Sequence, residues 1–122
     1  MSWIESAENV LIDFEGKNNI PFRFERFDCD LSQLPDTYLV YFLVSDPPTA
    51  HYDNKEASHE VRMQVSLFYR DISAINALPD KIIKAFAAAG FKRAGCGRIP
   101  YQQNTGHYGW RCDFNFYERR GN

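Results

Sequence analysis

The chain is short of several features that would assign it to a class of function. Its 122 residues contain no apolar run of membrane-spanning length, and Glu5 and Glu8 stand where a secretion signal would carry positive charge. The net charge of −2 provides no overall field that attracts nucleic acid. We therefore expect a soluble, intracellular protein with no membrane partner and no sequence-specific nucleic-acid partner, one that leaves its cell only inside a larger particle.

Cysteine is scarce and poorly spaced for metal binding. The odd number, Cys29, Cys96 and Cys112, favours a reduced setting. Zinc sites usually present ligands in close pairs such as C-x2-C, and no such pair accompanies His107. We expect no metal and no cofactor, with Cys112 as a buried structural residue. A nucleophilic Cys96, activated by His107 or His59, stays open as an alternative.

Catalytic signatures are missing as well. The Gly-Cys-Gly triplet at residues 95–97 lacks the glycine spacing of phosphate-binding loops, and we expect it to form a bend before a hairpin. We expect most of the acidic side chains to lie in solvent-exposed loops or to cap helices. Asp113 falls beside Arg111 on a polar strand face. We expect an ion pair there, either to a neighbouring strand or, where subunits assemble into stacked rings, between one ring and the next. We predict no catalytic residue and no enzymatic activity.

The clearest positive signal is an alternating segment at residues 59–69. Its apolar members recur at every second position: Val61, Met63, Val65, Leu67 and Tyr69. Polar residues occupy the positions between them, with Phe68 as the exception. This period of two predicts a long strand in a sheet with one covered face and one wet face.

Helices are predicted on either side of this strand. A capping box formed by Ser2 and Glu5 starts a helix over residues 3–15, which Gly16 is expected to stop. A second helix begins at Asp71 or Ser73 and restarts at Pro79. It ends in a Schellman motif at residues 90–91. Its expected buried stripe is Ile82, Ile83, Phe86 and Ala87.

Further strands complete the prediction. Residues 22–27 read as a short strand and residues 37–44 as a central strand covered on both faces, with a long polar segment at 47–58. A C-terminal hairpin is formed by residues 98–103 and 108–117. The fold class is α+β: one domain over residues 1–122, with a mainly antiparallel or mixed twisted sheet, an N-terminal helix and a second helix before the hairpin.

Phe68 breaks the polar side of the alternating strand. An aromatic ring there, next to an aromatic neighbouring strand, predicts a second covered face. The N-terminal helix or another subunit could supply that cover, because a second copy can seat on an unpaired apolar patch.

The order of these elements resembles the tail-completion (tail-terminator, head–tail joining) proteins of tailed bacteriophages and prophages. Tyr38-Leu39-Val40-Tyr41 is similar to the family's Y-x-V-Y strand, and Tyr52-Asp53-Asn54-Lys55 to its loop motif. Leu67-Phe68-Tyr69-Arg70-Asp71 is similar to its strand ending in an aromatic pair and Asp. A helix closing at residues 90–91, then residues 101–105 and Phe114-Asn115-Phe116, follow in family order. The resemblance covers residues 34–118, and the first 33 residues lie outside it.

The resemblance implies a structural protein of the virion, without enzymatic activity or cofactor. Such proteins form rings, often hexameric, that complete the tail and join it to the head connector, with room for genome DNA in the lumen. The implied partners are further copies of the chain, the tail tube and the head connector. The implied location is the bacterial host cytoplasm and then the virion neck. Candidate contacts to a neighbouring subunit or the tail tube are His51, Tyr52, Asp53, Phe68 and Arg70. Deleting residues 50–55 should then abolish assembly and leave the monomer folded.

Two other classes stay open. A small cytosolic α+β module could hold a ligand or a protein between sheet and helices, and a large apolar pocket with convergent polar groups would favour it. An enzyme using Cys96 would require a thiol that reacts at neutral pH and a cleft around it.

Overall fold

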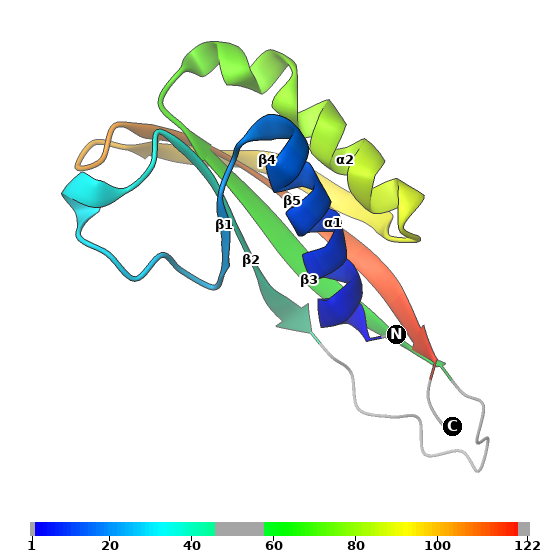
Figure 1. Cartoon of the computed structure of the whole chain (residues 1–122). Coiled ribbons are helices and arrows are strands. Elements are labelled where there is room, and N and C mark those ends of the chain that lie inside the picture. Colours follow the sequence, from blue (N-terminus) through cyan, green and yellow to red (C-terminus); the bar gives the residue numbers. More distant parts are fainter. Residues whose placement is uncertain (1, 46–57, 120–122) are drawn as a thin grey trace.

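The computed structural model describes residues 2–45 and 58–119 and forms one α+β domain (Figure 1). The elements follow in the order α1 (Trp3–Asn18), β1 (Phe22–Phe24), the 3₁₀ turn η1 (Leu31–Gln33), β2 (Thr37–Ser45), β3 (Ser58–Tyr69), the 3₁₀ turn η2 (Ile72–Asn76), α2 (Leu78–Ala88), β4 (Lys92–Gln102) and β5 (His107–Arg119). The five strands form one sheet in the order β1-β2-β3-β5-β4. Only β1 pairs in parallel, so the predicted α+β class and mainly antiparallel, mixed sheet are confirmed.

Strand β3 lies at the centre, and its apolar side is buried as the alternation predicts, but the side predicted to be wet is partly covered: Ser66 is buried and Phe68 half-buried. It is antiparallel to β2 on one side and to β5 on the other. Val61, Met63, Val65, Leu67 and Tyr69 are each fully buried. The prediction for β2 holds only over its first half. Residues 38–41 are buried, but Leu43 and Val44 are exposed, because only the short β1 covers that edge and it pairs only with residues 39–41.

Helix α1 starts as its capping box predicts. Ser2 Oγ accepts from the Glu5 amide at 3.2 Å, and the Ser2 amide donates to Glu5 Oε1 at 3.2 Å. The predicted stop at Gly16 is wrong, since the helix continues to Asn18. Asn19 takes the left-handed conformation instead, with φ 56°, and donates its amide to the Glu15 carbonyl. Asparagine tolerates this conformation better than most residues, so it ends the helix in place of glycine.

Helix α2 is preceded by its own capped turn. Asp71 caps η2 by accepting from the Ser73 amide at 3.0 Å, and Pro79 lies in the first turn of α2. The Schellman ending is confirmed: Gly90 has φ 94°, and the Phe91 amide donates to the Phe86 carbonyl at 3.0 Å.

The predicted stripe of α2 needs one correction. Ile82 and Phe86 are buried and Ile83 is partly buried, but Ala87 is exposed. Ala85 packs against the core in its place. The helix is rotated so that its alanine-rich side turns toward α1.

The bend expected at residues 95–97 is wrong, because these residues lie inside β4 and pair with β5. The irregularity in the ladder falls between Arg93 and Gly95 instead. Glycine at 109 is required by close approach, since a Cβ there would lie 2.6 Å from the Ile99 Cβ. The hairpin itself is confirmed, with longer arms than the sequence predicts.

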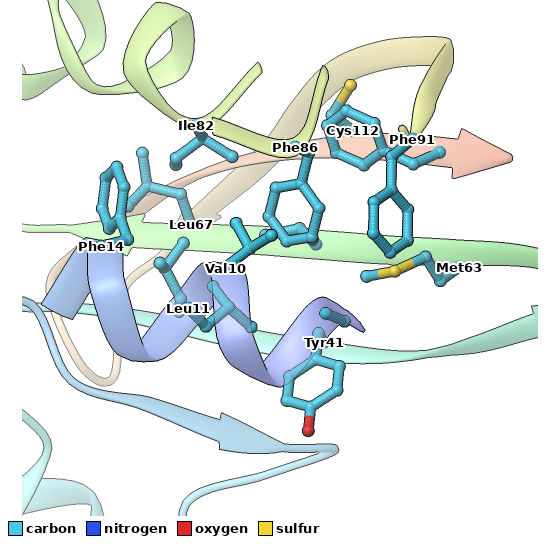
Figure 2. Packing of buried hydrophobic residues seen from close by; sticks show 14 of the residues in the cluster. Val10, Leu11, Phe14, Tyr41, Met63, Leu67, Ile82, Phe86, Phe91 and Cys112 are labelled. Atoms are coloured by element: carbon cyan, nitrogen blue, oxygen red, sulfur yellow. The ribbon is translucent and has the colours of Figure 1, made fainter. Parts of the chain in front are cut away.

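Both helices lie on the same face of the sheet, and the core fills the space between the two layers (Figures 1 and 2). Figure 2 shows Val10, Leu11 and Phe14 of α1 pointing at the same region as Ile82 and Phe86 of α2. Phe86 stacks on Phe114 of β5 at 4.9 Å between ring centroids. The opposite face of the sheet carries no helix among the described residues.

Candidate functional site

Phe68, a predicted contact residue, lies on the helix-free face of the sheet and has partners within its own chain. Its ring stacks on Tyr38 of β2, with centroids 5.1 Å apart and planes inclined by 25°. Tyr38 is flanked in turn by Phe27 and His107. A shallow cavity of about 270 Å³ separates Phe68 from the segment of residues 25–34. Helix α1 packs on the other face, so that segment is what approaches Phe68.

Arg70, the second described candidate, joins two loops. Its Nη1 lies 2.6 Å from Oδ1 of Asp36, and its Nε donates to the Thr105 carbonyl at 3.0 Å. The guanidinium thus ties the start of β2 to the β4–β5 turn. A role of Phe68 or Arg70 in contacts between subunits stays a prediction. The other three candidates, His51, Tyr52 and Asp53, and the deletion of residues 50–55, lie outside the described residues.

Asp113 is the centre of a polar network on the helix-free face. Only 5% of the residue is exposed. Arg62 of β3 donates from Nε to Oδ2 at 2.9 Å, and its Nη2 lies 2.8 Å from the same oxygen. Gln64 donates to Oδ1 at 3.0 Å, and Arg111 lies 3.5 Å from that oxygen. The predicted ion pair across strands is confirmed, with Arg62 as the closer partner.

Two of the three cysteines are joined. Cys96 and Cys112 face each other across β4 and β5 and form a disulfide, whereas Cys29 is free and exposed. The prediction of a buried Cys112 is confirmed, but the assumption of a free thiol there is wrong. The strand register brings two residues 16 positions apart into direct opposition. The odd count reflects one pair and one thiol, and the sulfur of Cys96 is not available as a nucleophile in this state.

His107 is buried on the helix-free face of the sheet, where it contacts the segment that precedes β2. Its Nε2 lies 2.9 Å from the Pro35 carbonyl, which can only accept, so Nε2 carries the proton. The buried Nδ1 finds no hydrogen-bond partner among the described residues. Within residues 2–45 and 58–119, no group of three or more His, Cys, Asp or Glu side chains gathers as metal ligands do. Through its hydrogen bond to the Pro35 carbonyl, His107 joins the start of β5 to the segment before β2.

Tyrosine hydroxyls near the core keep their protons. Burial, followed by the hydrogen bond from its hydroxyl to Glu8 at 2.9 Å, raises the pKa of Tyr41 far above its ordinary value. Burial also raises the pKa of Tyr69, against the opposing effect of the Arg98 guanidinium. Burial is the main cause of the raised pKa of Tyr38. These shifts lead away from neutrality, so none of these hydroxyls is poised for proton transfer near pH 7.

A groove that the sequence analysis missed runs between α1 and α2, on the outer side of the helix layer. Its volume is about 770 Å³. Val10 and Phe14 of α1 contribute its apolar lining together with two alanines of α2 and its C-cap Ala89, and polar side chains from both helices border it. The residues of α2 that line it are Lys81, Lys84, Ala85 and Ala88. The helical spacing of residues 81, 84, 85 and 88 indicates that they share one face of the helix. Because alanine is small and common on helix surfaces, that face gave no sign of a groove in the sequence.

Neither helix in the described parts of the chain is long and apolar enough to cross a membrane. No family model matches the chain, and a search of curated proteins returns no match.

Proposed function

We propose that this protein is a structural assembly protein of a tailed phage or prophage. It completes or terminates the tail and joins it to the head connector as a ring of identical subunits, without cofactor or catalysis. It acts in the bacterial host cytoplasm during assembly and remains in the virion neck. The resemblance of the sequence motifs at residues 38–41, 67–71 and 114–116 supports this proposal.

The observation that carries the proposal is a group of large apolar side chains that stay exposed on α1, β1 and β2. Ile12, Phe24, Leu43 and Val44 are each between 38% and 59% exposed. Leu31, Ile72, Tyr101 and Tyr117 are exposed elsewhere on the described surface. Exposed apolar surface can mark contacts with other proteins, and identical subunits in a ring cover such surface by head-to-tail contacts.

A deletion strain tests the proposal. The gene would be removed from the strain that encodes it, the prophage induced, and the lysate viewed by electron microscopy. We expect filled heads and unjoined or abnormally long tails, with normal particles restored by the wild-type gene supplied in trans. Normal, infectious particles from the deletion strain would contradict the proposed function.

The groove between α1 and α2 favours a second candidate, a binding module for an apolar anionic ligand. Its volume lies in the range of small-molecule sites, and Lys81 and Lys84 border it. Saturable binding of 1-anilinonaphthalene-8-sulfonate at one site per chain, lost in an Ala88→Arg variant, would support this candidate. A Cys96-dependent enzyme is not proposed, because that sulfur is bonded to Cys112.

A further inference from the structure

The lysine groove is the first of two complementary surfaces on this chain. We define it by Val10 and Phe14 at its base and by Lys81, Lys84 and Ala88 along the α2 wall. The alanine side of α2 lets another helix approach closely, because side-chain size at the contact sets the distance between helix axes.

The groove carries an uncompensated positive charge. Lys17 also lines it, but its Nζ lies 3.1 Å from Oδ2 of Asp13, so these two charges compensate each other. Lys81 and Lys84 form no ion pair with the rest of the described chain. An occupant of the groove should therefore be apolar in the middle and acidic at its edges.

The second surface lies on the other side of α1, toward β1, and we call it the acidic ridge. It comprises Glu8, Ile12 and Glu15 of α1 with Phe24 of β1. Ile12 is 59% exposed, and the two glutamates lie one turn before it and three residues after it. Phe24 adjoins the same region, because its ring contacts Tyr41 at 5.2 Å while the Tyr41 hydroxyl donates to Glu8.

The two surfaces face away from each other across the helix layer. Figure 1 shows α1 between β1 on one side and α2 on the other. The groove lies on the α2 side and the ridge on the β1 side. A surface and its complement at opposite ends of one subunit produce a head-to-tail contact, which closes into a ring when the rotation between copies allows it.

We infer that the acidic ridge of one copy docks into the lysine groove of the next copy, with Ile12 over Ala88 and Glu15 beside Lys84. The inference rests on the proposed function and names the surfaces through which its ring forms. An exposed isoleucine with a carboxylate about one turn away matches, in polarity and charge, an alanine-lined groove bordered by two lysines that pair with no acidic residue of the described chain.

Two variants that each disable one surface test this inference. Ile12→Asp destroys the ridge and leaves the groove, whereas Ala88→Arg fills the groove and leaves the ridge. Both side chains are exposed, so the fold should persist, as unchanged circular dichroism and unfolding midpoints would verify. Association would be measured by sedimentation velocity up to about 1 mM protein, where a contact with a Kd of about 0.5 mM is half formed.

We expect each variant alone to be monomeric where the wild type associates, with affinity reduced about tenfold or more. An equal mixture of the two should form dimers and nothing larger, because only one intact ridge meets one intact groove. A matched pair, Lys84→Glu and Glu15→Lys, should likewise associate only when mixed. Association of the wild type should weaken as salt is raised.

Three results would overturn the inference. The first is a mixture that stays monomeric at the highest concentration. The second is a variant that associates as the wild type does. Subunits would then contact each other through another surface, and the proposed function would stand. The third is loss of 1-anilinonaphthalene-8-sulfonate binding in Ala88→Arg with no effect of Ile12→Asp on association, which would make the groove a ligand site. The deletion strain tests the proposed function separately.

Discussion

Replacing Asp113 with alanine is expected to destabilise the protein far more than the same change at Asp36, although both residues pair with an arginine. The two carboxylates differ in burial. The side chain of Asp113 is 7% exposed and meets Arg62 at 2.8 Å, while that of Asp36 is 83% exposed and meets Arg70 at 2.6 Å. Both changes remove an aspartate–arginine pair, but the buried Asp113 also accepts from Gln64 and lies near Arg111.

The magnitude follows from the partners that each change leaves behind. Removing one member of a buried ion pair costs about 3–5 kcal/mol, because the other charge loses its partner. Arg62 keeps 43% of its side chain in contact with solvent, and water can take over part of its hydrogen bonding. We therefore expect a loss of about 2–3 kcal/mol for Asp113→Ala. For Asp36→Ala we expect about 0–1 kcal/mol, as for other solvent-exposed pairs.

Urea unfolding followed by circular dichroism measures both values. The midpoint should fall clearly for Asp113→Ala at unchanged m, and hardly at all for Asp36→Ala. Asp113→Asn, which keeps the shape and can still accept from Gln64, should fall between them. Equal losses for the two alanine variants would refute the reasoning, since burial would then not decide the contribution of the pair.

Three further predictions concern the core and the strand pairing. Because the pKa of Tyr41 is raised in the folded state, the stability it contributes is complete below the unfolded value of about 10 and is lost as pH rises above it. Tyr41→Phe should therefore flatten the fall of the thermal midpoint above about pH 10, and an unchanged slope would contradict this cause. Phe86→Ala should cost about 3–5 kcal/mol in urea unfolding, because Phe86 is 1% exposed, stacks on Phe114 and meets Phe91 edge to face; a loss below about 1 kcal/mol would be inconsistent with the packing. Alkylation of the unfolded, unreduced protein should label Cys29 alone by mass spectrometry, and reduction should expose Cys96 and Cys112 and lower stability by about 3 kcal/mol for a loop of this length; labelling of all three thiols before reduction would contradict the disulfide.

Local features were predictable because their causes lie within a few residues. The capping box at Ser2, the alternation of β3 and the Schellman ending at Gly90 each depend on hydrogen bonds or periodicity over a short stretch. The stop at Gly16 failed for the same local reason, since Asn19 could take the left-handed conformation three residues later. Ala87 was misassigned because helical spacing alone does not say how far a helix is rotated on its sheet.

The candidate surfaces were not predictable in the same way. Ala85 and Ala88 line a groove only because α1 packs beside α2 and leaves a space between the two helices. Phe68 was correctly singled out as an exception to the polar side of β3. Its partner, Tyr38, and the approach of residues 25–34 depend on the path of a segment that carries no periodic signal.

By itself, the sequence determined that this chain is one α+β domain whose central strand has a fully apolar side and whose two helices cover a sheet, because a period of two or of 3.6 residues dictates which side chains can be buried together. Tertiary structure alone decided which residues from different elements meet: Cys96 with Cys112, Asp113 with Arg62, and the lysines of α2 with the groove beside α1. Register and helix docking set these meetings through packing over the whole domain, and no short stretch of sequence encodes them.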